Sequence, residues 1–238
     1  MWSGPRNLST AMMRAFENRA DTVVWDEPLY AAYLQTTGIE HPMREAVIAA
    51  GEPDWVRVAA RCGAPCDGAD VFYQKHMTHH LLPDMSRDWL SALQHGFLLR
   101  DPKRVLLSYS LKRESVSLDD IGIEQQWAVF QHVADRIGEA PVVVDSDVFL
   151  TAPEAHLRMM CSRWGIAFSS AMLSWPAGAR ASDGAWAPHW YASVWASTGF
   201  GPARAPETGT LPSHLQRILD QAQPLYEKLL AHAQPVAA

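Results

Sequence analysis

The stretch SGPRNLST, residues 3–10, decides the predicted fold because a helix pattern follows it directly. Apolar residues recur at helical spacing over residues 11–16, which predicts a helix that ends near Arg19. Ser9 or Thr10 can cap the first turn of this helix. The free backbone N–H groups of that turn and the positive end of the helix dipole would then face the loop. A loop of this kind is a candidate anion site.

The side chains of this loop strengthen that hypothesis. Arg6 adds a full positive charge, and Ser9 and Thr10 add hydroxyl donors. The Walker pattern Gly-x4-Gly-Lys-Ser/Thr is absent from the loop, which tells against ATP or GTP chemistry through that motif. A simpler interpretation stays open, in which Ser9 only caps a helix and Arg6 is a solvated surface charge.

Strand and helix patterns alternate along the rest of the chain. Short apolar runs predict buried strands at Thr22–Trp25, Val71–Gln74, Gly96–Leu99 and Pro141–Val144. Further helices are predicted at Pro83–Leu93, Pro102–Leu111, Ile121–Ile137, Pro153–Trp164 and Leu211–Ala231. This alternation predicts a three-layer α/β fold, a parallel sheet flanked by helices, with ligands at the carboxyl ends of the strands. Only Met1 and Trp2 precede the loop, so the first strand is expected to be short.

Composition limits the classes of function. The 238 residues are expected to form one domain with a packed core, and the formal charge of −6 argues against a nucleic-acid partner. No apolar run approaches the ~18–20 residues of a membrane span, and the first residues lack a signal-peptide pattern, so we expect a cytoplasmic protein. Cys62, Cys66 and Cys161 predict reduced thiols rather than a disulfide framework. Cys62 and Cys66 have no second Cys/His pair at zinc-site spacing.

A second candidate anion site lies in FLLRDPKRVLLSYS, residues 97–110. Arg100 ends a predicted strand, Pro102 opens the next helix, and Ser108 lies on that helix. Arginine offers a planar fork that suits phosphate, and serine adds a neutral donor, so the two could bind one anion. Alternatively, Arg100 could form a surface salt bridge and Ser108 could bond within its own helix.

Both segments resemble the nucleotide-binding motifs of sulfotransferases that use 3′-phosphoadenosine 5′-phosphosulfate. The family's 5′-phosphosulfate loop matches Pro5, Arg6, Asn7, Leu8, Ser9 and Thr10, and its 3′-phosphate motif, Arg-x-Pro-x5-Ser, matches Arg100, Pro102 and Ser108. Leu8 stands where the family usually has glycine. Residues 142–168 also resemble the family's late strand, loop and helix. The resemblance covers roughly residues 3–173.

The resemblance implies a P-loop NTPase-like sulfotransferase fold of a bacterial branch. It also implies 3′-phosphoadenosine 5′-phosphosulfate as cosubstrate, a small-molecule acceptor with a hydroxyl or amine, and no metal. Two other functions stay open: a small-molecule kinase on the same architecture, and a nucleotide-binding or interaction protein without transfer activity. The acceptor's identity and the oligomeric state are left undecided.

Two residues are candidates for the general base that removes the acceptor proton. Glu27 follows Asp26 at the end of a predicted strand, and some sulfotransferases resemble this arrangement and use the glutamate before a proline. Other members use a histidine after a lysine, and here His76 follows Lys75 directly, one residue short of the family's spacing. Glu27 could instead pair with Arg6, which the resemblance also places in the catalytic loop. The identity of the general base therefore stays undecided: it is Glu27, it is His76, or it is neither of them.

Two further clusters allow more than one interpretation. His76, His79 and His80 could form a helix face or, less favourably, bind zinc without a matched carboxylate. The segment 175–201 contains Trp175, Trp186, Trp190, Tyr191, Trp195 and Phe200. Its aromatic side chains could wall an acceptor pocket or stack on adenine, or they could form a second hydrophobic cluster.

Overall fold

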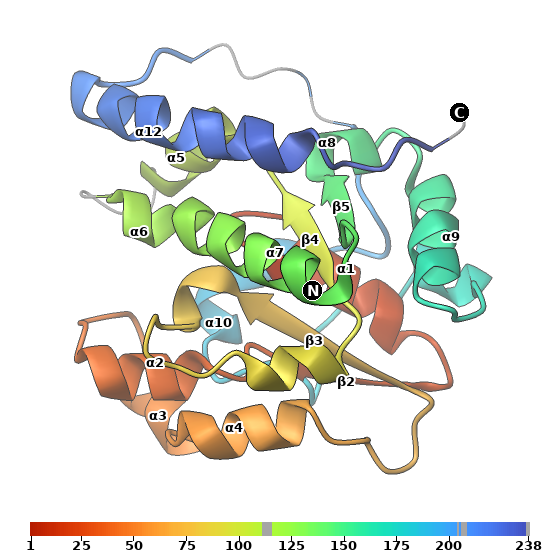
Figure 1. Ribbon diagram of the computed structural model, residues 1–238. Helices are drawn as coiled ribbons and strands as arrows, with labels where there is room; N and C mark the ends of the chain where they lie inside the picture. Colours follow the sequence, from red (N-terminus) through yellow and green to blue (C-terminus); the bar gives the residue numbers. More distant parts are fainter. Residues whose placement is uncertain (111–115, 204, 206–208, 237–238) are drawn as a thin grey trace.

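The computed structural model describes residues 1–110, 116–203, 205 and 209–236. These residues form a five-stranded parallel sheet with the order β2-β3-β1-β4-β5 (Figure 1). The strands are β1 (Trp2–Ser3), β2 (Thr22–Asp26), β3 (Val71–Met77), β4 (Gly96–Leu99) and β5 (Val142–Asp145). The predicted α/β fold and its four predicted strands are therefore confirmed.

The expectation of a short first strand is also confirmed. β1 has two residues, yet it occupies the middle of the sheet, because Trp2 pairs with His76 of β3 and with Phe97 of β4. The loop that leaves β1 therefore starts at the centre of the sheet's carboxyl edge, where an α/β fold binds its ligands.

Most predicted helices are present. They correspond to α1 (Ser9–Glu17), α5 (Pro102–Ser110), α7 (Ile123–Ile137), α9 (Pro153–Arg163) and α12 (Ser213–Leu230). The predicted start of α7 at Ile121 is wrong, because Gly122 has a φ of +67° and separates α7 from α6 (Leu118–Ile121). The predicted end of α5 at Leu111 lies outside the described residues.

The predicted helix at Pro83–Leu93 is wrong. This segment contains only the 3₁₀ turn η2 (Asp88–Ala92). The Ser86 hydroxyl accepts a hydrogen bond from the Asp88 backbone N–H at 3.2 Å and donates one to the Asp88 carboxylate at 2.9 Å. Such local bonds of serine and aspartate compete with helix formation, which accounts for the difference.

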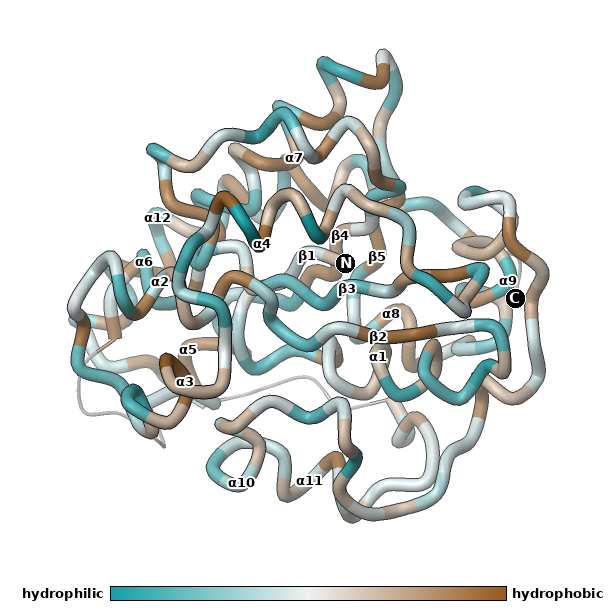
Figure 2. Tube along the Cα trace, turned by 90° about the horizontal axis from the view of Figure 1, so that it is seen from below, coloured by the Kyte–Doolittle hydropathy of each residue, from teal (hydrophilic) through white to brown (hydrophobic). Residues whose placement is uncertain are grey.

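Three helices that the patterns did not predict lie between β2 and β3. They are α2 (Tyr30–Thr37), α3 (Arg44–Ala50) and α4 (Trp55–Cys62). The remaining short helices are η1 (Thr78–His80), α8 (Ser146–Phe149), η3 (Ser170–Leu173), α10 (Ala187–Trp190) and α11 (Ala192–Trp195). α10 and α11 adjoin each other at the rim of the molecule (Figure 2).

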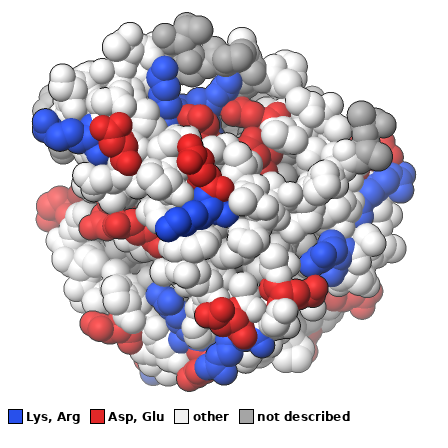
Figure 3. Space-filling model, turned by 45° about the horizontal axis from the view of Figure 1, so that its top comes forward, with Lys and Arg blue, Asp and Glu red and all other residues white. Residues whose placement is uncertain are grey.

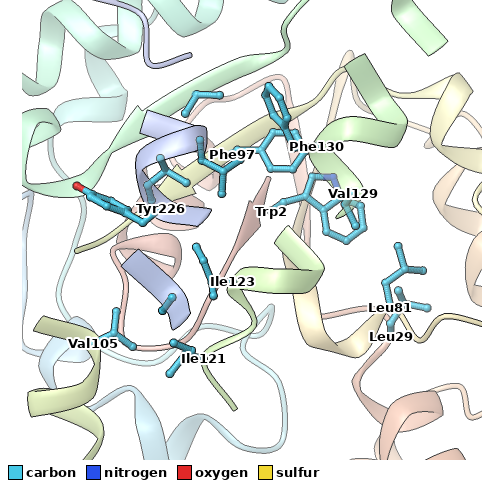
Figure 4. Close-up of a cluster of buried hydrophobic side chains, with 14 of the residues drawn as sticks. Trp2, Leu29, Leu81, Phe97, Val105, Ile121, Ile123, Val129, Phe130 and Tyr226 are labelled. Atoms are coloured by element: carbon cyan, nitrogen blue, oxygen red, sulfur yellow. The ribbon is translucent and has the colours of Figure 1, made fainter. Parts of the chain in front are cut away.

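Helices cover both faces of the sheet, as the three-layer prediction requires. On one face, Trp2 and Phe97 pack with Val129 and Phe130 of α7 and with Tyr226 of α12 (Figure 4). On the other face, residues of β3, β4 and β5 pack against α1, α8 and α9; the cluster includes Phe16, Tyr73, Leu98, Val144, Phe149, Leu157 and Met160. Alternation along each strand produces these two cores.

The surface carries both signs of charge. Basic and acidic side chains are interspersed over the described part of the face in Figure 3. Among the described helices, none combines the length and the apolar character that crossing a membrane requires.

A buried histidine links the short strand β1 to the rest of the core. The Trp2 indole N–H donates to His95 Nδ1 at 3.0 Å, and His95 Nε2 donates to the Leu90 carbonyl at 2.8 Å. His95 can accept the bond from Trp2 only while its imidazole is neutral. Burial lowers the pKa of His95 from 6.5 to about 4, so the folded protein resists the protonation that would break this bond.

We therefore expect acid to destabilise the fold through His95. Between pH 6.5 and 4 the unfolded chain binds a proton at this position that the folded chain does not, so the free energy of unfolding falls by about 3 kcal/mol. Urea unfolding at a series of pH values measures the loss. It should be smaller in His95→Asn and unchanged in His214→Asn, which alters an exposed histidine. An identical pH dependence in His95→Asn and the wild type would contradict this explanation.

Candidate active site

A pocket of about 220 Å³ opens at the carboxyl edge of the sheet. Its walls include the loop 5–8 with the first turn of α1, together with Glu27, Lys75 and Arg100 from the ends of three strands. The segment with α10 and α11 supplies another wall. Segments far apart in the sequence therefore meet around one cavity.

The loop before α1 differs in one respect from its prediction. α1 begins at Ser9, its N-cap residue is Leu8, and no side chain caps the helix. The expectation that Ser9 or Thr10 is the cap is therefore wrong, because both residues belong to the first helical turn and line the pocket. Their hydroxyls and the uncapped backbone N–H groups of this turn are suited to an anion.

Asn7 and Leu8 fix this loop to the core. Asn7 Nδ2 donates to the Leu98 carbonyl of β4 at 2.9 Å, and Asn7 Oδ1 accepts from the Leu8 backbone N–H at 2.8 Å and from the Ser146 hydroxyl. Leu8 packs against the hydrophobic cluster that includes Phe16. The leucine that stands in place of the expected glycine thus anchors the loop through packing.

Arg6 connects the two predicted anion sites. Its Nε donates to the Ser108 hydroxyl at 3.0 Å, and its carbonyl accepts a hydrogen bond from the Arg100 guanidinium. The backbone of Arg6 has a φ of +57°, a left-handed conformation that is uncommon for a residue with a side chain. Such conformations cluster at functional sites. Arg6, Arg100 and Ser108 all line the pocket, so the structure brings the two motifs together.

Glu27 lies in the same pocket with an ion network beneath it. Lys75 Nζ donates to Asp26 Oδ1 at 2.9 Å and to Glu27 Oε1 at 2.5 Å. Parallel pairing of β2 with β3 sets Asp26 opposite Lys75, which explains this contact. Glu27 therefore pairs with Lys75 rather than with Arg6. Its φ of +43° makes it the second pocket residue with a left-handed backbone.

Burial acts on the pKa values of both Lys75 and Glu27 in this network. It opposes the charge of Lys75, but Asp26 and Glu27 together raise the pKa of Lys75 well above its usual value, so the ammonium stays charged. Burial also raises the pKa of Glu27, although Lys75 acts in the opposite direction. A carboxylate with a raised pKa is a stronger base than an exposed glutamate.

Tyr191 ties the aromatic C-terminal segment to this network. Its hydroxyl donates to Asp26 Oδ2 at 2.7 Å and accepts from Lys75 Nζ at 2.9 Å and from the Trp186 indole at 3.0 Å. Trp186, Trp190 and Tyr191 also line the pocket. Trp186 and Tyr191 also belong to a hydrophobic cluster with residues of α2, which confirms the cluster interpretation for these two residues. The interpretation of the segment as an acceptor wall stays a prediction.

The structure does not bring His76 into the pocket. Side chains alternate along β3, so Lys75 faces the pocket while His76 lies on the other face, stacked on Trp2 with ring centroids 4.4 Å apart. Its Nε2 lies 3.1 Å from Gln74 Oε1. His79 and His80 do line the pocket, and His80 Nδ1 is 3.9 Å from Glu27 Oε2. Among the described residues, no His/Cys/Asp/Glu group is arranged to hold a metal ion.

The sequence patterns did not predict that Lys75 and Tyr191 join Asp26 in one network beside Glu27. For Lys75 a signal existed, because the period-2 alternation of a strand separates Lys75 from His76. For Tyr191 no local signal exists, because its partners Asp26 and Lys75 are 165 and 116 residues away in the sequence.

Comparison with known proteins gives a consistent result for the fold. A family model described as "Sulfotransferase domain" matches residues 1–233. Among solved structures, the sulfotransferase domain of the Synechococcus PCC 7002 olefin synthase aligns with a TM-score of 0.59 at 16% identity, over 98% of this chain and 94% of that one.

Two plant proteins are closer in sequence. They are the branched-chain-amino-acid aminotransferase-like proteins 1 and 2 of Arabidopsis thaliana, which are 36% and 34% identical over 232 residues, 97% of this chain. The chain spans 41% of the length of each.

Proposed function

Because this chain belongs to the sulfotransferase domain family, we propose that it moves a sulfuryl group from 3′-phosphoadenosine 5′-phosphosulfate to a hydroxyl or amine of a small acceptor. One observation carries the proposal. Arg6, Arg100 and Ser108 are joined by hydrogen bonds in the same pocket that contains the largely buried carboxylate Glu27. The pocket thus offers groups that can bind an anionic donor and a carboxylate that can take a proton from the acceptor.

Each group has a role that its chemistry supports. The loop 5–8, the first turn of α1 and Arg6 would hold the 5′-phosphosulfate end of the donor, and Arg100 with Ser108 would hold the 3′-phosphate. Glu27 accepts the proton of the acceptor while the new S–O or S–N bond forms and the S–O bond to the leaving phosphate breaks. Arg6 and the helix dipole stabilise the negative charge that the leaving phosphate gains.

The pocket draws its walls from residues between Pro5 and Val194. This spread supports our proposal that residues 1–238 act as a single domain. Because the chain matches less than half of its plant relatives, whatever else those proteins do is not carried over to it.

The names of these relatives raise aminotransferase chemistry as a second possibility. Aminotransferases need a lysine amine that can form a Schiff base with their cofactor. The lysine that lines this pocket, Lys75, is bonded to two carboxylates and to the Tyr191 hydroxyl, and its pKa is raised well above the usual value. A permanently charged ammonium is a poor nucleophile, so the structure favours sulfuryl transfer.

Calorimetric titration with adenosine 3′,5′-bisphosphate and with AMP tests the proposal. Wild type should bind the bisphosphate more tightly, and Arg100→Ala should remove most of the difference, because a hydrogen bond to a charged group contributes about 1.5–3 kcal/mol. Arg57→Ala is the control, since its side chain is 74% exposed and lies outside the pocket. Equal affinity of the wild type for the two nucleotides would show that Arg100 and Ser108 bind no 3′-phosphate.

A further inference from the structure

Two adjacent carboxylates, Asp26 and Glu27, share the ammonium of Lys75, but their surroundings differ. Asp26 accepts from Lys75 Nζ at Oδ1. At Oδ2 it accepts from the Tyr191 hydroxyl at 2.7 Å and from the Gly184 backbone N–H at 3.3 Å. The Asp26 side chain is 1% exposed and lies outside the pocket lining, whereas Glu27 lines the pocket and accepts from Lys75 at Oε1. Donors thus occupy both oxygens of Asp26, and Glu27 is the carboxylate that a bound molecule can reach.

These bonds decide which of the two carboxylates takes up a proton more readily. Two carboxylates and one ammonium leave one formal negative charge in a buried site, and two like charges this close favour uptake of one proton. Hydrogen bonds that a carboxylate accepts favour its charged form, so a proton on Asp26 would weaken the bonds from its donors. Glu27 can take the proton at Oε2 and keep Lys75 at Oε1. The proton is therefore better placed on Glu27.

The titratable groups around the two carboxyls add no further charge at neutral pH. These groups are Tyr30, Tyr73, His80 and Tyr191. Burial raises the pKa of the three tyrosines and lowers the pKa of His80 well below its usual value, so all four are neutral. Burial also raises the pKa of Glu27; Lys75 opposes this rise, and the charge of Asp26 adds to it.

Asp26 also fixes part of the pocket wall. Its Oδ2 accepts from Gly184 and from Tyr191, which lie on either side of α10 in the sequence. Trp186 donates to the Tyr191 hydroxyl at 3.0 Å, and both of these residues line the pocket. Lys75 Nζ donates to the same hydroxyl at 2.9 Å. We call residues 184–191 the α10 wall; a carboxylate outside the pocket lining holds this wall and Lys75 together.

We propose that Asp26 is a positioning residue that stays ionised throughout the reaction, holds Lys75 and the α10 wall in place, and directs the exchanged proton to Glu27. The inference rests on the proposed function in one respect, because it takes Glu27 as the general base. It adds a division of roles that the proposed function does not require. Of two carboxylates on one ammonium, Asp26 maintains the structure and Glu27 exchanges the proton.

Carboxyl ¹³C NMR from pH 4 to pH 9 tests this division without any need for transfer activity. In the wild type, the Glu27 carboxyl should titrate above the ordinary glutamate value of about 4.3, and Asp26 should stay ionised while Glu27 titrates. In Asp26→Asn, the Glu27 midpoint should move to lower pH, because the neighbouring negative charge that favours protonation is gone. Amide hydrogen exchange of the α10 wall should become faster in this variant. The wild-type titration decides where the proton resides even if Asp26→Asn does not fold.

Asp183→Asn is the matched control. Asp183 is a second buried carboxylate beside the α10 wall: it accepts from the Arg180 backbone N–H at 2.8 Å and from the Trp195 indole at 2.9 Å. Its charge is paired with Arg14. Asp183→Asn should speed amide exchange in the α10 wall and leave the Glu27 midpoint unchanged. It therefore separates the effect of the Asp26 charge from the effect of a loosened wall.

Each outcome decides a different point. If Asp26 titrates together with Glu27 in the wild type, or if Glu27 keeps its midpoint in Asp26→Asn, the division of roles is wrong. It is also wrong if Asp183→Asn moves the Glu27 midpoint as far as Asp26→Asn does. Unchanged amide exchange of the α10 wall in Asp26→Asn would show that Asp26 does not hold this wall. If the titrations follow the prediction but the wild type does not bind adenosine 3′,5′-bisphosphate, the two roles stand and the proposed transfer function is wrong.

Discussion

Glu27→Gln is expected to lower the rate of sulfuryl transfer by about 10²–10⁴-fold, the contribution of a positioned general base. Glutamine keeps the shape of the side chain and the oxygen that accepts from Lys75, but it cannot take a proton. Nucleotide affinity should change little, because Arg6, Arg100 and Ser108 remain. The effect is measured as transfer of ³⁵S from labelled donor to a panel of phenols, alcohols and amines, with wild type and variant compared on each compound that accepts the label.

Two histidine variants serve as comparisons. His76→Ala should reduce stability rather than the transfer rate, because His76 stacks on Trp2 outside the pocket. His80→Gln tests the histidine that does reach Glu27. Full turnover in Glu27→Gln would assign the base to another residue: to His80 if His80→Gln is inactive, or to His76 if His76→Ala is inactive while stably folded.

The pH profile gives a second measure of the role of Glu27. A base must be deprotonated to act, so the rate falls as the pH drops below its pKa. Burial raises the pKa of Glu27, so the acidic limb of kcat/KM should lie above the ordinary glutamate value of about 4.3. Glu27→Gln should remove this limb from the residual activity. A limb that persists in Glu27→Gln belongs to another group.

Lys75→Met is expected to destabilise the fold by about 3–5 kcal/mol at neutral pH, the usual cost of removing one partner of a buried ion pair. The Lys75 side chain is 2% exposed, and its removal leaves Asp26 and Glu27 buried beside each other without a cation. Chemical denaturation measures the loss. Lys228→Met, which changes an exposed lysine of α12, should stay within about 0.5 kcal/mol of the wild type.

The pH dependence of the stability deficit distinguishes the loss of the ion pair from a packing defect. Without Lys75, the ammonium no longer lowers the pKa of Glu27 and burial raises it further in the folded state, so the unfolded chain releases this proton first as the pH increases. The stability deficit of Lys75→Met should therefore grow from pH 4 to pH 8. Adding Asp26→Asn and Glu27→Gln should recover much of it. A deficit that is independent of pH would contradict the electrostatic explanation.

Sequence patterns predicted the elements whose signals are local. β4 and α5, for example, follow from a run of apolar residues and a proline at the first helical position. The helix α4 also had a readable signal, since Asp54 is its N-cap and accepts from the Val56 N–H at 2.9 Å. α2 gave a weak signal, because Tyr30, Ala31, Ala32 and Leu34 are all buried and leave no polar stripe of helical period.

The sequence by itself determined the strand–loop–helix order, the loop 5–8 before the first helix and the spacing of Arg100 and Ser108, because each depends on residues close together in the chain. Only the tertiary structure decided which titratable groups share the pocket. Strand pairing places Lys75 beside Asp26, strand alternation sends His76 to the opposite face, and chain folding brings Tyr191 across 116 residues to Lys75. Such contacts form from the summed packing of the whole sheet and its helices, so no local pattern of residues encodes them.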